Sequence, residues 1–190
     1  INTHAQNNKT RLENSLLWEV SGNGLAKPSY LYGTVHMICA DDFFISENTQ
    51  KAFEAADQLV MEINLADTNE LNFAKNAAMG NELLSQKLNK DELAKLDTLV
   101  KRTMSLSVAQ LDNYSLATIM SLISLKSFGC TDLKFYEMEF IEKAKSHNKK
   151  ISGLETVKYQ FQIIENAYNN SEMITMLESM DTDQTAKLVS

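Results

Sequence analysis

Three short apolar runs of this 190-residue chain each end on an ionisable side chain, and this pattern constrains the fold more than any other feature. The runs are Leu31–His36, Leu59–Glu62 and Ile151–Glu155. Parallel strands place their carboxyl ends along one edge of a sheet, and open α/β sheets bind ligands at that edge. An imidazole and two carboxylates meeting there would form a metal site or an acid/base site. We therefore expect an α/β protein whose site lies at the strand ends.

The first third of the chain predicts a β-hairpin followed by a βαβ unit. Residues 15–22 and 30–36 read as two strands joined by the turn sequence Ser-Gly-Asn-Gly. A helix is predicted over 46–56, and a strand over 58–65 that is apolar on both faces, as a parallel strand between helices is. A right-handed βαβ crossover would place His36 and Glu62 at the same edge of neighbouring parallel strands.

The middle of the chain is predicted to be helical throughout. Residues 67–128 contain two capping boxes, at Asn89–Glu92 and Ser107–Gln110, and apolar side chains at helical spacing. We interpret this block as a helical insertion or lid between two parts of an α/β core, residues 15–66 and residues 129–190. The predicted fold class is therefore α/β, with a mixed sheet, an N-terminal β-hairpin, a βαβ unit and a large α-helical insertion.

Composition excludes two classes of partner. The net charge is −7 and no stripe of Lys or Arg is present to neutralise phosphates, so nucleic acid is not expected. The longest uncharged stretch, residues 113–125, is well short of the roughly 20 apolar residues that a membrane span needs. We expect no transmembrane segment in this chain.

The first residues are polar and without helical or strand period. Residues 1–14 are predicted to be a flexible tether, because they contain no amphipathic pattern and no initiator Met. Removal of a leader peptide or an artificial start would both produce such a beginning. The former favours a secreted or extracytoplasmic protein, in the periplasm or cell envelope.

The two cysteines are far apart in the sequence and form no Cys-x-x-Cys pair, so a zinc site of that kind is not predicted. In an oxidising compartment Cys39 and Cys130 can form a disulfide that closes a long loop. Two separate buried thiols are the equally weighted alternative.

Each of the three strand-end residues has a chemical and a structural interpretation. His36 can bind a divalent metal or take up a proton near neutral pH, or can be a half-buried histidine bonded to a backbone carbonyl. Glu62 interrupts an apolar strand, so it needs a metal, a cation or hydrogen bonds unless solvent reaches it. Glu155 precedes a predicted helix, whose dipole by itself would favour a carboxylate there. Asn64 and Gln160 are candidates to support the site from a second layer.

At these residues the sequence resembles the TraB/GumN family, which includes the Tiki-type metalloproteases. The order and spacing of the matching phrases extend over roughly residues 15–168. The phrases are Leu17-Trp18-Glu19-Val20-Ser21-Gly22, Pro28-Ser29-Tyr30-Leu31-Tyr32-Gly33-Thr34-Val35-His36, Leu59-Val60-Met61-Glu62 and Gly153-Leu154-Glu155-Thr156 with Gln160.

The resemblance implies a mixed α/β fold and an extracytoplasmic, divalent-metal-dependent hydrolase, with peptide cleavage known for Tiki-type members. The family's first Gly-x-x-His motif maps onto Gly33 and His36, and its acidic positions map onto Glu62 and Glu155. Manganese or a similar ion is the expected cofactor. The family's second Gly-x-x-His motif has no counterpart in this sequence, so we expect a site that is open to water or incomplete.

Two functions follow as hypotheses. In the first, His36, Glu62 and Glu155 hold a divalent metal, and the site hydrolyses a peptide or protein with His36 and Glu62 in catalytic roles. In the second, the same cleft binds and sequesters a peptide or small ligand without cleaving it.

Overall fold

The computed structural model describes residues 14–181, so most of the predicted tether, residues 1–13, lies outside the described residues. The chain divides into two compact units. The first consists of the residues up to Val35 together with Phe44–Ala56. The second consists of His36–Phe43 together with the chain from Asp57 onward. No helix within residues 14–181 is both long enough and apolar enough to cross a membrane.

The first unit contains the predicted hairpin. Strands β1 (Leu17–Val20) and β2 (Ser29–Tyr32) pair antiparallel, with Leu17 opposite Tyr32. Three consecutive turn residues, 22–24, have positive φ values, which glycine and asparagine tolerate best. Helix α1 (Glu47–Ala55) begins at Ser46, whose Oγ accepts the Thr49 N–H at 3.1 Å. The local signals in this part of the sequence predicted both elements correctly.

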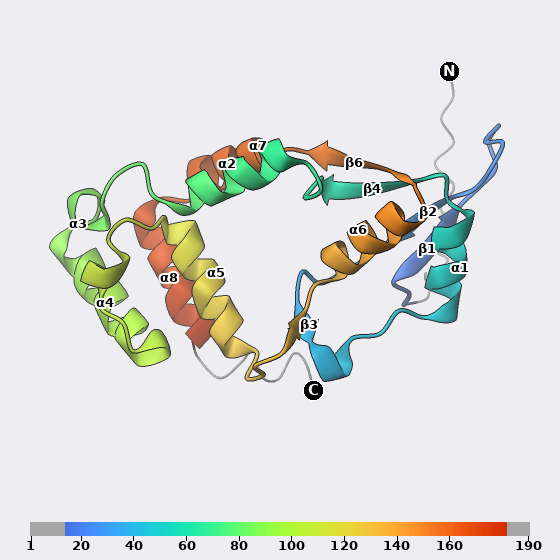
Figure 1. Cartoon of the computed structure of the whole chain (residues 1–190). Coiled ribbons are helices and arrows are strands. Elements are labelled where there is room, and N and C mark those ends of the chain that lie inside the picture. The colour runs from blue at the N-terminus through green and yellow to red at the C-terminus, as the bar shows by residue number, and fades with distance from the viewer. Residues whose placement is uncertain (1–13, 182–190) are drawn as a thin grey trace, which may run out of the picture. The chain divides into compact units, whose positions relative to one another are not determined.

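The second unit contains a parallel pair of strands that carries the candidate site. Strands β4 (Gln58–Ile63) and β6 (Lys150–Glu155) run side by side, with Ile63 opposite Glu155 (Figure 1). Helix α6 (Tyr136–Ser146) packs against both strands and buries Ile141 and Ala144. Because the pairing is parallel, both strands end at the same edge.

The α/β class is confirmed, but the predicted βαβ partner of β4 is wrong. Within residues 14–181 the strands form three two-stranded sheets, and the parallel neighbour of β4 is β6, not the strand that leads to His36. Strand β2 ends at Tyr32. The residues after His36 form β3 (Ile38–Cys39), which pairs antiparallel with β5 (Leu133–Lys134).

The physical reason for this difference is a set of contacts that attach the segment after His36 to the residues before α6. A disulfide joins Cys39 to Cys130, with their Cα atoms 5.9 Å apart. The ring centroid of Phe43 lies 4.6 Å from that of Tyr136. The first of the two interpretations of the cysteines is therefore the observed one.

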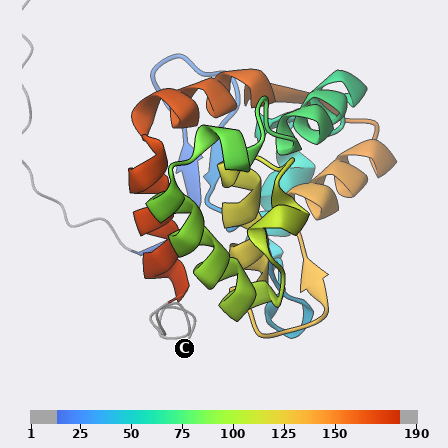
Figure 2. The same cartoon turned by 90° about the vertical axis from the view of Figure 1, so that its left-hand side faces the viewer.

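The remaining helices form an apolar core of their own. Helices α4 (Lys90–Met104) and α5 (Leu116–Ser127) pack with α8 (Asn170–Asp181), as Figure 2 shows. The side chains of Leu96, Ile119 and Leu177 are completely buried there. The other elements of this region are α2 (Thr68–Ala78), α3 (Leu84–Lys87), the short 3-10 helix η2 (Val108–Leu111) and α7 (Val157–Ala167); a further 3-10 turn, η1 (Ala40–Asp42), follows β3.

Candidate functional site at the ends of β4 and β6

The two predicted carboxylates, Glu62 and Glu155, are both hydrogen-bonded to the side chain of Gln160. Gln160 Nε2 donates a hydrogen bond to Glu62 Oε1 at 2.6 Å and another to Glu155 Oε2 at 3.2 Å. Glu62 and Glu155 stand at the ends of neighbouring parallel strands, and Gln160 lies in the first turns of α7. Since one amide nitrogen bonds both carboxylates, the two acids and Gln160 form a single cluster.

Local structure holds the start of α7 in place. Thr156 is its N-cap residue, and its Oγ1 accepts the Tyr159 N–H at 3.2 Å. The carboxylate of Glu70, from α2, accepts the Val157 N–H at 2.8 Å. Gly153 permits the close passage of the two strands, because a Cβ at this position would lie 2.8 Å from the backbone nitrogen of Asn64. These contacts fix the turn from β6 into α7 that presents Gln160 to the carboxylates.

His36 lies in the same unit but pairs with a residue that the sequence did not single out. Its Nδ1 is 3.0 Å from Oε1 of Glu137, in the first turn of α6. The His36 side chain is 76% exposed, whereas that of Glu137 is only 18% exposed. A carboxylate bonded to Nδ1 fixes the orientation of the ring and leaves Nε2 as the nitrogen that can bind a ligand.

Electrostatics connects His36 to the carboxylate cluster. The hydrogen bond to Glu137 raises the pKa of His36 above its ordinary value of 6.5, against the opposing effect of partial burial. The charges of Glu137 and then of Glu62 raise it further. Glu62 therefore acts on the imidazole through space, although no hydrogen bond joins them.

Asn64, the other predicted supporting residue, makes a local contact. Its Oδ1 accepts the Ala66 N–H at 3.1 Å, in the turn that follows β4. Glu137 was missed because it looks like any acidic residue in the first turn of an amphipathic helix, where the helix dipole favours it. No other signal in the sequence marks it.

The oxygen and nitrogen donors near the ends of β4 and β6 are of the kind that hard or borderline divalent cations prefer. Within residues 14–181, no three His, Cys, Asp or Glu side chains are grouped closely enough to hold a metal ion. The two carboxylates nevertheless meet at the Gln160 N–H donor, a position that favours positive charge. Carboxylate oxygens with one imidazole are ligands that suit manganese or zinc.

Replacing Glu137 by Gln should lower the pKa of His36. The raised pKa means that the pair stabilises the folded protein fully below the unfolded-state pKa, near 6.5, and that this contribution is lost as the pH rises through the folded-state pKa. Because His36 is exposed and screened by solvent, the stability change is at most about 1 kcal/mol. An NMR titration of the imidazole in both proteins measures the shift directly. Equal His36 pKa values in the two proteins would contradict the pairing.

The parallel pair of β4 and β6, packed against α6, places this chain in the α/β class, in which ligands commonly bind at the carboxyl ends of the strands. The sequence profile of the TraB/PrgY/gumN family matches residues 16–190, nearly the whole chain, and the chain belongs to this family. No curated protein and no solved structure matches it.

Proposed function

We propose that this chain is an extracytoplasmic, divalent-metal-dependent hydrolase of peptides. The observation that carries the proposal is the convergence of Glu62 and Glu155 on one point at the ends of two parallel strands. Family membership is consistent with it. The Cys39–Cys130 disulfide favours an oxidising compartment, since such bonds are rare in the cytosol.

In this proposal the residues have separate roles in binding the metal, orienting the imidazole and accepting a proton. Glu62 and Glu155 would hold the metal, with manganese as the proposed ion, and Nε2 of His36 would become the third ligand if its exposed side chain turned toward the cluster. In the structure Glu137 orients the imidazole through Nδ1. A bound divalent metal supplies a water of lowered pKa and polarises a carbonyl group. Glu62 can accept a proton from an attacking water, and Gln160 holds the two carboxylates together when they are not bound to a cation.

Direct metal titration tests the site. We expect the wild-type protein to bind Mn²⁺, and Glu62→Gln and Glu155→Gln each to weaken the binding by about tenfold or more, since losing even a supporting partner of a metal ligand typically costs 10- to 100-fold. Glu142→Gln changes an exposed carboxylate of α6 outside the cluster and is the matched control. Calorimetry or the electron paramagnetic resonance of free Mn²⁺ measures the affinity. Identical Mn²⁺ binding by all four proteins would remove the metal site from the proposal.

Peptide cleavage tests the chemistry separately. With Mn²⁺ present, the wild-type protein should cleave peptides of a mixed library, and Glu62→Gln should lower kcat/KM by about 100-fold or more, in the range typical of lost acid/base catalysis. Peptides that bind with high affinity but are released intact would instead support a non-catalytic sequestering module.

A further inference from the structure

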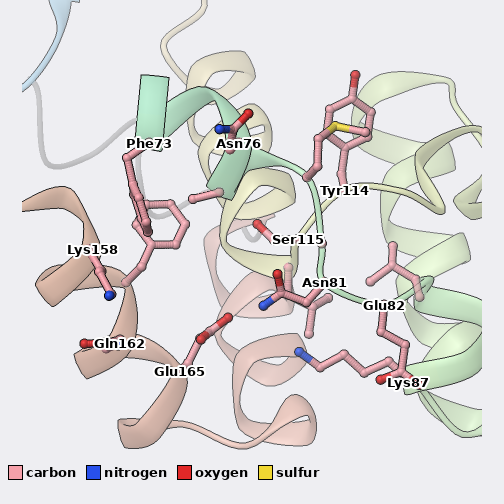
Figure 3. Close-up of a pocket in the computed structure, with 16 residues that line it drawn as sticks. Phe73, Asn76, Asn81, Glu82, Lys87, Tyr114, Ser115, Lys158, Gln162 and Glu165 are labelled. Atoms are coloured by element: carbon pink, nitrogen blue, oxygen red, sulfur yellow. The ribbon is translucent and has the colours of Figure 1, made fainter. Parts of the chain in front are cut away.

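A second site of different chemistry lies on another side of α7. A pocket of about 350 Å³ opens between the end of α2, the loop of residues 79–82, the start of α5 and α7 (Figure 3). This volume falls in the range of small-molecule sites. Its α7 residues are Lys158, Phe161, Gln162 and Glu165, which share one face of the helix at i, i+3, i+4 and i+7 spacing. Gln160 is not among them, so the pocket is distinct from the carboxylate cluster.

Backbone hydrogen bonds shape the far wall of the pocket. The Gly80 N–H donates to the Asn113 carbonyl at 2.8 Å, and the Ser115 N–H donates to the Ala78 carbonyl at 3.1 Å. A Cβ at Gly80 would lie 2.9 Å from the Glu82 carbonyl oxygen, so a side chain there would displace the loop. The pocket is therefore preformed by the chain and not only by flexible side chains.

The charged side chains of the pocket are unpaired within the part of the chain that the structure describes. The side chains of Lys87, Lys158, Glu82 and Glu165 line it, and none of them makes an ion pair or hydrogen bond with any residue between 14 and 181. Figure 3 shows Glu165, on α7, directed toward Asn81 and Lys87, and Lys158 on the same helix farther from both of them. The lining combines both signs of charge with the apolar side chains of Phe73, Leu84 and Phe161, and this combination suits a ligand that carries both charges.

The spacing along α7 defines the length of that ligand. Seven residues of helix separate Lys158 from Glu165 by about 10 Å along the axis. Phe161 stands between them along the helix, on the same face, and also lines the pocket. An extended peptide rises about 3.3 Å per residue, so three residues with free ends place an ammonium and a carboxylate about 10 Å apart.

We propose that this pocket binds a short linear zwitterion, namely an unblocked peptide of about three residues with an apolar central side chain. Its carboxylate pairs with Lys158, its ammonium pairs with Glu165, and its central side chain contacts Phe161. Binding requires neither a metal nor cleavage, so this proposal does not depend on the hydrolase assignment.

Calorimetry with the metal-free full chain and the tripeptide Ala-Leu-Ala tests the proposal. Each end of the peptide forms a charge-assisted hydrogen bond, so Lys158→Gln and Glu165→Gln should each weaken binding by about tenfold or more. Acetylating the amino end should abolish the effect of Glu165→Gln, and amidating the carboxyl end should abolish the effect of Lys158→Gln. This crossed pattern assigns each end of the peptide to one side chain.

Two controls separate this site from the carboxylate cluster and from misfolding. Lys145→Gln changes an exposed lysine of α6 and should leave tripeptide binding unchanged, as should Glu62→Gln. Circular dichroism verifies that each variant is folded. Failure of the wild-type protein to bind the tripeptide, or equal affinities for the free and the doubly blocked peptide, would overturn the proposal. A loss of tripeptide binding in Glu62→Gln would also overturn it, because the ligand would then lie in the cluster.

Discussion

Removing the Cys39–Cys130 disulfide should lower the free energy of unfolding by about 3–5 kcal/mol. The two cysteines are 91 residues apart, and a crosslink that closes so long a loop strongly restricts the unfolded chain. The double variant Cys39→Ser/Cys130→Ser is the appropriate protein, because it leaves no free thiol. Urea unfolding of the oxidised wild-type protein and of the double variant measures the difference.

The disulfide should also affect the pairing of His36 with Glu137. It lies beside the short β3–β5 ladder, which attaches the residues after His36 to the residues before Glu137. We therefore expect the double variant to show a His36 pKa closer to 6.5 than the wild-type protein does. A reducing agent should destabilise the wild-type protein and leave the double variant unchanged. A loss of stability below about 1 kcal/mol would show that the loop is held by other contacts.

Replacing Leu177 by Ala should destabilise the protein by about 3–5 kcal/mol. Leu177 is completely buried, in α8, where that helix packs against α4 and α5. Truncating such a side chain loses its transfer free energy and leaves a cavity. Leu154→Ala removes the same atoms from a side chain that is 77% exposed and should cost no more than about 0.5 kcal/mol.

Urea unfolding of both leucine variants measures this contrast. The comparison is informative because α8 lies within residues 129–190, the second part of the predicted α/β core, yet its apolar side chains pack in the core of the helical region. If the two substitutions cost the same, α8 would not be packed in solution as the structure shows.

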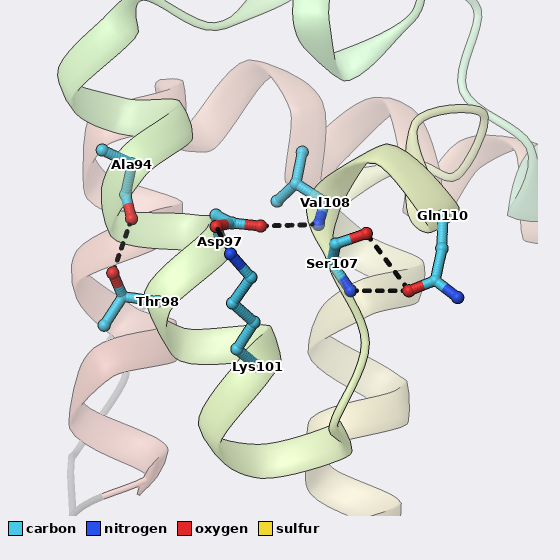
Figure 4. A network of polar contacts seen from close by, with 7 residues as sticks. All are labelled: Ala94, Asp97, Thr98, Lys101, Ser107, Val108 and Gln110. Atoms are coloured by element: carbon cyan, nitrogen blue, oxygen red, sulfur yellow. Dashed lines mark hydrogen bonds and ion pairs between the residues drawn. The ribbon is translucent and has the colours of Figure 1, made fainter.

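Turns and helix caps, which depend only on residues close together in the sequence, were predicted correctly. The turn at residues 22–24, the Ser46 cap of α1 and the capping box at Asn89–Glu92 are all observed. Figure 4 shows the second predicted box, in which the Ser107 N–H donates to Gln110 Oε1 at 2.9 Å. The same figure shows a contact that no local signal marks, the Val108 N–H bonded to Asp97 at 3.0 Å. That bond, after the larger effect of Lys101, lowers the pKa of Asp97.

The candidate site was predicted in part. Glu62 and Glu155 were singled out because each ends an apolar run, and this is a local property of the strands. Their grouping with Gln160 is observed, but through the pairing of β4 with β6 and not through a βαβ unit after His36. The Glu137 partner of His36 was not predicted, since an acidic residue early in a helix is too common to be informative.

The sequence by itself determined the helices, the hairpin and the residue types at the strand ends, because turn, capping and periodicity signals act over a few residues. Only the tertiary structure decided which of these parts meet. Gln160 bonds a residue 98 positions away, His36 pairs with one 101 positions away, and the disulfide spans 91. At such separations many pairings are compatible with the same local pattern, and the packing of the whole chain selects one of them.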